Sequence, residues 1–184
     1  MSAASVHQDA SASARRLKLM AFDVDGVLTD GSLFYTDEGI EIKAFNTLDG
    51  HGLKMLQRAG ITVAIITGRR ARCVEIRARN LGIEYLFQAV DNKLEVMNSL
   101  LAKLALTADQ AGYMGDDVLD LPVMTACAFS ATPGDGHALV QRHAALTTVR
   151  HGGRGAVREA CEYILDAQGK LAAALAPYLA MGER

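Results

Sequence analysis

The feature that most constrains this chain is a short apolar run that ends in two aspartates. Residues Leu19–Phe22 are all apolar, as in a strand buried on both faces, and Asp23, Asp25 and Gly26 follow at once. Burying an unpaired carboxylate is costly, and neighbouring carboxylates repel each other unless a cation lies between them. The pattern therefore predicts a metal site beyond the end of this strand, where open α/β sheets bind ligands. The structural alternative is an Asx-rich turn with a positive φ at Gly26.

Strand-like and helix-like segments alternate along the rest of the chain, which predicts an α/β fold with a doubly wound, mostly parallel sheet. The later strands are expected over residues 61–66, 85–90, 110–114, 128–131 and 145–149, with helices between them and a last helix running to about residue 175. A β-hairpin over residues 32–45 should overhang the acidic strand tip. We expect one domain over residues 17–184, with a loop and helix over 150–176, and a disordered tail over residues 1–16.

Composition narrows the classes of function. The formal net charge is -2 among 184 residues, no basic stretch stands out and Trp is absent, so we expect no nucleic-acid partner. No apolar run approaches the roughly 20 residues of a membrane span. Three widely spaced cysteines without a CxxC pair, Cys73, Cys127 and Cys161, are typical of a reducing compartment. We therefore expect a cytoplasmic protein without a membrane partner.

Polar residues follow several of the predicted strands. Thr67 comes directly after the strand 61–66, Asp116 and Asp117 come after the strand 110–114, and Lys93 opens the helix after the strand 85–90. Parallel strands end at one edge of a sheet, so these residues should converge on the aspartates after Phe22. Taken singly, Thr67 could be a capped strand end and Lys93 a solvated helix start; their joint placement favours a site.

The residue types of this predicted cluster suit phosphoryl transfer. Asp23 and Asp116 can supply carboxylates to a Mg²⁺ ion. An oriented Asp23 carboxylate can attack phosphorus and form an aspartyl-phosphate, while Asp25 donates a proton to the leaving oxygen and then takes one from water. Thr67 can hydrogen-bond a phosphoryl oxygen, and Lys93 can neutralise negative charge.

These motifs, in this order and spacing, resemble the four motifs of the haloacid dehalogenase (HAD) superfamily, in its phosphotransferase branch. The resemblance covers Leu19 to about Gly155 and implies a Rossmann-like HAD fold. It makes Asp23 the nucleophile and Asp25 the acid/base, together with Thr67 and Lys93 as catalytic residues. It also implies a Mg²⁺ ion held by Asp23, by the backbone carbonyl of Asp25 and by Asp116, with Asp117 and Asp120 in support.

A narrower resemblance is to the 3-deoxy-D-manno-octulosonate 8-phosphate (KDO 8-phosphate) phosphatase family. It rests on Phe45–Gly52, on Ile66–Arg69, on Arg77 before Leu81 and on Gly152–Glu159. It implies a small hairpin in place of a cap domain, a homotetramer in which neighbouring subunits close the site, and a role in lipopolysaccharide precursor synthesis. The substrate-binding residues that it implies are Asp25, Asn46, Thr47, Leu48, Asp49, Gly50, Lys54, Arg69, Arg77 and Lys93.

A sugar-acid phosphate carries a carboxylate, which an arginine can bind through two hydrogen bonds, and Arg69 or Arg77 could do this. For each, a solvent-facing position on a helix is the plainer interpretation. The similar phosphatases for nine-carbon 9-phosphates tend to carry an acidic residue where this chain has Arg69, which favours the eight-carbon substrate. The glycine-rich loop Arg150–Gly155 is either a flexible lead into the last helix or a segment that reaches a neighbour's site.

Two other classes of function remain open at this point. A receiver-type phosphoacceptor domain is also doubly wound and also has clustered aspartates, Thr, Lys and Mg²⁺. Receivers, however, put the acidic pair on the first strand and the acceptor aspartate on a later one, whereas here the expected nucleophile and its acid/base partner share the first strand. A catalytically idle relative used in assembly ranks last, because every motif residue is present.

Overall fold

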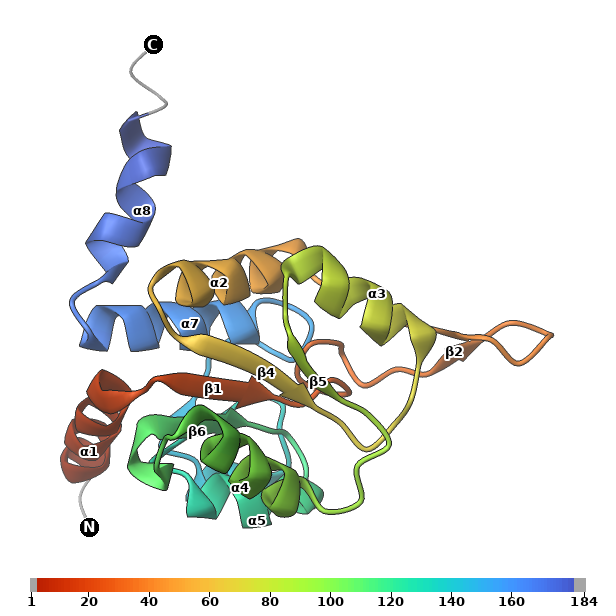
Figure 1. The fold of residues 1–184 in the computed structure, drawn as a ribbon, viewed down its shortest axis with the longest axis horizontal. Coiled ribbons are helices and arrows are strands. Elements are labelled where there is room, and N and C mark those ends of the chain that lie inside the picture. Colours follow the sequence, from red (N-terminus) through yellow and green to blue (C-terminus); the bar gives the residue numbers. More distant parts are fainter. Residues whose placement is uncertain (1–2, 181–184) are drawn as a thin grey trace.

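The computed structural model describes residues 3–180, whose core is a six-stranded parallel sheet in the order β5-β4-β1-β6-β7-β8 (Figure 1). Its strands are β1 (Leu19–Phe22), β4 (Thr62–Ile66), β5 (Tyr85–Phe87), β6 (Ala111–Met114), β7 (Phe129–Thr132) and β8 (Leu146–Thr147). Strand β1 is central, with Leu19 opposite Thr62 on one side and Ala111 on the other. This position explains why all four of its residues are apolar and buried.

Helices cover both faces of the sheet, as predicted for a doubly wound α/β fold. Helices α2 (Thr47–Arg58), α3 (Arg72–Leu81) and α7 (Ala156–Ala167) lie on one face, and α4 (Lys93–Leu104), α5 (Leu121–Ala126) and α6 (Ala138–His143) on the other (Figure 1). Each face has its own apolar core. Short 3-10 turns, Ala108–Gln110 and Val118–Asp120, precede β6 and α5. No helix within residues 3–180 has the length and apolar character needed to cross a bilayer.

The predicted hairpin is present but its strands are short. Strands β2 (Phe34–Tyr35) and β3 (Glu41–Ile42) pair antiparallel and extend away from the edge at which the strands of the main sheet end (Figure 1). The ladder is limited to two residue pairs, and no other strand among the described residues pairs with it. Its apolar side chains are consequently exposed, Phe34 by 52% and Ile40 by 62%.

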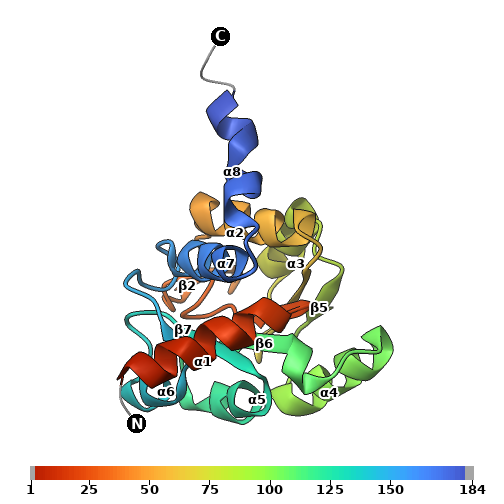
Figure 2. The same cartoon turned by 90° about the vertical axis from the view of Figure 1, so that its left-hand side faces the viewer.

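The disorder predicted for residues 1–16 is wrong for the part that the structure describes, where Ala3–Arg16 form helix α1 (Figure 2). Ala10 and Ala14 are fully buried in the core that includes α7. Their small side chains let the helix approach closely, so the alanine-rich composition reflects packing rather than disorder. The side chain of Gln168 fastens the end of α1 by donating hydrogen bonds to the carbonyls of Ala14 (3.1 Å) and Leu17 (3.0 Å).

The predicted last helix is two helices. Helix α7 ends at Ala167, the chain turns at Gly169, whose φ is +67°, and α8 (Leu171–Ala180) projects from the body of the protein (Figure 1). A left-handed residue interrupts an α-helix, which the apolar pattern of this region did not indicate. Helix α2 begins at Thr47, because the side chain of Asn46 caps it by accepting a hydrogen bond from the Leu48 amide (2.8 Å).

Candidate active site

The ends of β1, β4 and β6 and the start of α4 line a cavity of about 330 Å³ on the side of the sheet where the hairpin lies. Eight polar residues that the sequence singled out line it: Asp23, Asp25, Thr67, Arg69, Lys93, Asp116, Asp117 and Asp120. The predicted convergence of residues from four separate segments is therefore confirmed. It follows from the parallel sheet, which brings the carboxyl ends of all its strands to one edge.

Three carboxylates lie close enough to share one cation. One oxygen each from Asp23, Asp116 and Asp120 lies within 4.8 Å of the others. Gly26 makes room for Asp116: its φ is +82°, and a Cβ atom there would lie 2.1 Å from Oδ2 of Asp116. Only a glycine fits both the backbone conformation and this approach.

Asp120 stabilises the acidic cluster through hydrogen bonds to its neighbours. Its Oδ2 accepts hydrogen bonds from the amides of Asp116 (3.0 Å) and Asp117 (3.2 Å), and its Oδ1 accepts from Lys93 Nζ (2.6 Å) and the Tyr113 hydroxyl (3.2 Å). With these four hydrogen bonds the buried carboxylate of Asp120 is largely satisfied. Asp23, which accepts one hydrogen bond at each oxygen, and Asp116 are then the carboxylates best placed to bind a hard cation, and oxygen ligands of this kind suit Mg²⁺.

Lys93 bridges two of these carboxylates. Its Nζ donates to Asp23 Oδ2 (2.7 Å) as well as to Asp120, and its side chain is almost fully buried. Burial works to lower the pKa of Lys93, but Asp23 and Asp120 outweigh it, and the pKa is raised. Lys93 is thus a fixed positive charge beside Asp23, where it can offset negative charge on a bound phosphoryl group.

Without a bound cation, the carboxylates of Asp23 and Asp116 are poorly stabilised in their ionised form. Burial, and then the charge of Asp120, raises the pKa of Asp23 to about 6, although Lys93 works against this shift. Burial, and then the charges of Asp120 and Asp23, raises the pKa of Asp116 to about 7. A divalent cation would relieve this repulsion, so the donor set fits the predicted metal.

Thr67 and Asp117 occupy the rim of the cavity. Thr67 is buried at the end of β4, where its amide donates to Phe87 O (3.0 Å) and its carbonyl accepts from Val90 N (3.2 Å). Asp117 uses Oδ1 to accept a hydrogen bond from the Val118 amide (2.7 Å). Thr67 thus has a fixed backbone at the cavity wall, and Asp117 shapes the turn that carries Asp116.

The hairpin supplies a set of ion pairs that the sequence analysis missed. Lys43 forms an ion pair with Asp25 and a second with Glu41 (2.5 Å), and its side chain is only 1% exposed. Glu41 also pairs with Arg69 (2.9 Å). Glu41 and Lys43 stand two residues apart, so they lie on one face of the hairpin strand. That spacing, in a hairpin expected to overhang the aspartates, is the signal that could have identified them.

Seven of the predicted substrate-binding residues lie outside the cavity in the single chain: Asn46, Thr47, Leu48, Asp49, Gly50, Lys54 and Arg77. Buried Asp49 caps helix α7 by accepting hydrogen bonds from the amides of Gly155 (3.2 Å) and Arg158 (2.9 Å). Arg77 donates to the carbonyl of Asn46 (2.9 Å) and lies over the Phe45 ring. The structure therefore gives Asp49 and Arg77 roles inside the fold, and their contacts with substrate remain a prediction.

The loop Arg150–Gly155 packs against the segment of its own chain that follows Asp25. The amide of Gly153 donates to Val27 O (2.9 Å), and the side chain of Asn46 donates to Gly153 O (3.2 Å). A Cβ atom on Gly152 would lie 1.8 Å from the carbonyl oxygen of Gly26. The loop thus supports the segment that follows Asp23 and Asp25, a contact that neither interpretation from the sequence included.

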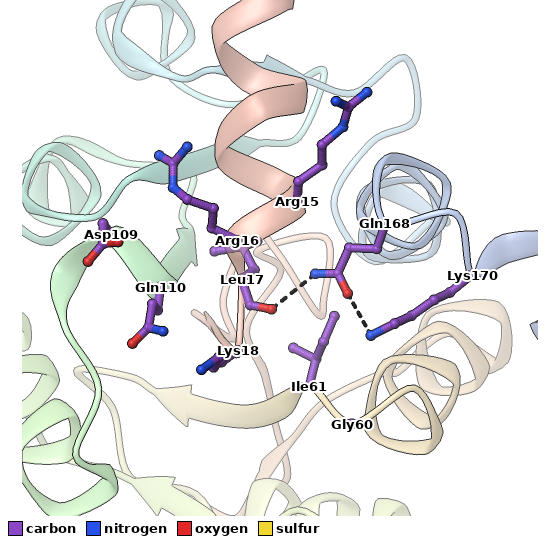
Figure 3. Close-up of a pocket in the computed structure, with 10 residues that line it drawn as sticks. All are labelled: Arg15, Arg16, Leu17, Lys18, Gly60, Ile61, Asp109, Gln110, Gln168 and Lys170. Carbon is purple, nitrogen blue, oxygen red and sulfur yellow. Dashed lines mark hydrogen bonds between the residues drawn. The ribbon is translucent and has the colours of Figure 1, made fainter.

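A second hollow, of about 510 Å³, lies at the opposite edge of the sheet (Figure 3). Its lining includes the four cations Arg15, Arg16, Lys18 and Lys170 and a single carboxylate, Asp109. Figure 3 shows the guanidinium groups of Arg15 and Arg16 pointing away from each other, and the Gln168 side chain bonded to Leu17 and Lys170. Because only one carboxylate lines this hollow, it offers no acidic cluster that could hold a metal ion, in contrast to the cavity that contains Asp23 and Asp116.

The chain is similar in sequence to known phosphatases. KdsC of Escherichia coli K12, a 3-deoxy-D-manno-octulosonate 8-phosphate phosphatase, is 46% identical over 166 residues, which are 90% of this chain and 88% of the relative. The chain belongs to the KdsC phosphatase family. No family model matches it.

Solved structures extend the match to the whole fold of this KdsC family member. The phosphatase of Moraxella catarrhalis, solved with a magnesium ion, a phosphate ion and KDO, is 39% identical with a TM-score of 0.90, and the match covers 96% of this chain and 99% of that one. A Legionella pneumophila protein described as a HAD superfamily hydrolase is 38% identical with a TM-score of 0.91, covering 96% and 97%. A receiver domain is excluded, because the chain is a HAD-type phosphoric monoester hydrolase.

Proposed function

We propose that this KdsC family member hydrolyses KDO 8-phosphate to KDO and phosphate through an aspartyl-phosphate on Asp23. The observation that carries the proposal is the cavity itself, where Asp23, Asp25 and Lys93 lie beside Arg69. The acidic and basic groups suit a phosphate ester, and the nearby guanidinium suits a carboxylate on the same molecule. The family relationship and the KDO-bound relative support this substrate.

In the proposed reaction, a carboxylate oxygen of Asp23 attacks phosphorus while the bond from phosphorus to the sugar oxygen breaks. Asp25 donates its proton to that oxygen, so KDO leaves as a neutral alcohol at this position. Asp25, now a carboxylate, then takes a proton from a water molecule that attacks the phosphoryl group on Asp23. This second step releases phosphate and returns both aspartates to their starting states.

The remaining residues of the cavity would orient the phosphoryl group. Lys93 is fixed on Asp23 and offsets negative charge, and the Thr67 hydroxyl would donate a hydrogen bond to a phosphoryl oxygen. Mg²⁺, held by Asp23, Asp116 and the carbonyl of Asp25, would neutralise charge on the transferring group when bound. Asp117 and Asp120 support this ligand set through the turn between β6 and α5.

The second candidate substrate is a nine-carbon sugar-acid 9-phosphate. The observation that favours the eight-carbon compound is the placement of Arg69 in the cavity beside Asp25, at 3.9 Å. The similar phosphatases for nine-carbon 9-phosphates tend to carry an acidic residue at this position. Substrate contacts from the predicted residues outside the cavity, among them Arg77 and Lys54, complete the proposal.

We also propose that the enzyme works in lipopolysaccharide precursor synthesis in the cytoplasm as a homotetramer. The exposed apolar side chains of the hairpin support an assembly, because an isolated hairpin gains little by exposing them. The three cysteines form no disulfide, as expected of a reducing compartment.

The test is phosphate release from eight-carbon and nine-carbon sugar-acid phosphates with Mg²⁺, for the wild type and for Asp23→Asn. We expect the wild type to prefer KDO 8-phosphate, and the variant to lose turnover by a factor of at least about 10³, since a neutral amide cannot form the phosphoenzyme. Circular dichroism checks that the variant is folded. Steady-state hydrolysis by the variant near the wild-type rate would overturn the role of Asp23.

A further inference from the structure

The guanidinium group of Arg69 is already occupied in the free protein. Its Nη2 atom donates hydrogen bonds to the Tyr35 hydroxyl (2.6 Å) and to Glu41 Oε2 (2.9 Å). Both acceptors belong to the hairpin, one on each of its strands. The Arg69 side chain is 44% exposed, so a molecule in the cavity can still reach it.

The use of Nη2 has a consequence for any incoming carboxylate. A guanidinium binds a carboxylate through two parallel N–H bonds, along its side with Nε and Nη2 or across its end with Nη1 and Nη2. Nη2 takes part in both arrangements, and both of its protons are engaged by Tyr35 and Glu41. A substrate carboxylate can therefore bind Arg69 in bidentate fashion only after Tyr35 or Glu41 gives up its hydrogen bond to Nη2.

Electrostatic repulsion favours the release of Glu41, rather than Tyr35, from Arg69. Two carboxylates on one guanidinium repel each other, whereas the neutral Tyr35 hydroxyl does not repel the substrate. Glu41 also has a second partner, because its Oε1 lies 2.5 Å from Lys43 Nζ. Lys43 is buried and paired with Asp25, so Glu41 can leave Arg69 without becoming an unpaired charge.

We propose that Glu41 is a specificity-determining residue that holds the place of the substrate carboxylate on Arg69. A sugar-acid phosphate exchanges its own carboxylate for that of Glu41, and a phosphate ester without a carboxylate has nothing to exchange. This inference rests on the proposed function, since it takes the substrate to be a sugar-acid phosphate. It adds that the hairpin competes with the substrate for Arg69.

The test is Glu41→Gln, which removes the charge but keeps the size of the side chain. Ion pairs near a protein surface stabilise only weakly, so losing this competitor should lower the KM for KDO 8-phosphate by a factor of up to about five. The ratio of kcat/KM for KDO 8-phosphate to that for glucose 6-phosphate, which lacks a carboxylate, should rise by a similar factor. The Kd of KDO measured by calorimetry should fall in parallel, independently of turnover.

Two further variants sharpen the test. Tyr35→Phe frees the other Nη2 proton and should lower the Kd of KDO by less than Glu41→Gln, because it removes a neutral partner. Glu38→Gln lies in the turn of the same hairpin, where Glu38 has no contact with Arg69, and serves as the matched control. It should leave the KM and the ratio at wild-type values.

The outcomes separate this inference from the proposed function. If the wild type does not release phosphate from KDO 8-phosphate, the proposed function fails. If the wild type does so but Glu41→Gln raises the KM and the Kd of KDO, Glu41 positions Arg69 for the substrate and the competition is wrong. An unchanged ratio of kcat/KM in a folded variant also overturns the proposal.

Discussion

At the scale of single residues, the carboxylates of the acidic cavity affect both the stability of the fold and its capacity to bind a metal ion. Asp23 and Asp116 face each other and Asp120 across less than 4.8 Å, with Lys93 as the positive charge bonded to the cluster. Such a cluster is unfavourable for the metal-free fold and favourable for an ion. The free energy of unfolding should therefore depend on pH and on Mg²⁺ together.

The raised pKa values of Asp23 (about 6) and Asp116 (about 7) determine the sign of this dependence. Above the unfolded value of 3.8 the unfolded chain has lost these protons while the native protein keeps them. The metal-free protein should thus lose stability as the pH rises from about 4 to about 7, and then level off. Mg²⁺ competes with the same protons, so its stabilising effect should grow over the same range.

Asp116→Asn tests this account. We expect the metal-free variant to be more stable than the wild type at about pH 8, with a Tm higher by several degrees, since about 1 kcal/mol corresponds to ~2–4 °C for a chain of this size. The rise in Tm caused by Mg²⁺ should be largely lost. Thermal denaturation with and without Mg²⁺ at about pH 5 and about pH 8 provides the measurement. Asp166→Asn, at an exposed position on α7, is the control, and an equal Mg²⁺ effect in Asp116→Asn would contradict the metal site.

At the scale of secondary-structure elements, the sheet is what made the site predictable. Strand β1 is apolar throughout because it lies between β4 and β6, and the residues after each strand meet because the strands are parallel. These features are local patterns that a single sequence contains. The sequence alone therefore predicts that Asp23, Thr67, Lys93 and Asp116 meet at one edge, and the cavity contains all four.

The features that sequence did not reveal depend on contacts between distant segments. Helix α1 is stabilised by burying Ala10 and Ala14 in the core that includes α7, and no local signal marks that partner. Asp49 stands in a motif that resembles substrate-binding residues, yet its carboxylate caps a helix that begins more than a hundred residues later. The pairing of Lys43 with Asp25 likewise requires knowing how the hairpin folds back over β1.

The close packing of the loop Arg150–Gly155 yields a prediction at this scale. In Gly152→Ala the added methyl group would overlap the carbonyl of Gly26, and relieving such overpacking costs about 1–3 kcal/mol. We expect a lower Tm and a lower kcat, because the displaced segment directly follows Asp23 and Asp25, the proposed catalytic aspartates. His151→Ala changes the exposed neighbour in the same loop and should retain both values. Wild-type kcat in Gly152→Ala would show that the loop does not support the site.

At the scale of the whole molecule, functional groups are gathered at one edge of the sheet and the terminal helices at the other. The cavity and the hairpin lie where the strands end, and α1 and α8 lie where they begin (Figure 1). The hairpin presents charged Glu41 and Lys43 to the cavity, and it exposes Phe34 and Ile40 to solvent. The hairpin therefore faces both the acidic cavity and the neighbouring subunits of the proposed tetramer.

The assembly can be tested on the apolar side of the hairpin. Phe34→Glu combined with Ile40→Glu should convert the proposed homotetramer to smaller species in light scattering, because the charges would be buried without partners in an interface. The KM for KDO 8-phosphate should rise if neighbours close the site. Ile76→Glu, which alters a comparably exposed apolar residue on α3, should leave the mass unchanged. A hairpin variant that keeps the wild-type mass would rule out this surface as the interface.

The burial of Lys43 gives the hairpin a mechanical link to the chemistry. A movement of the hairpin would be passed through the Lys43–Asp25 ion pair to Asp25, the proposed proton donor. A subunit whose hairpin is held in the proposed tetramer and an isolated subunit would then differ in how rigidly the Asp25 side chain is oriented. In the proposed tetramer, the orientation of Asp25 in one subunit would then depend on the subunits that hold its hairpin.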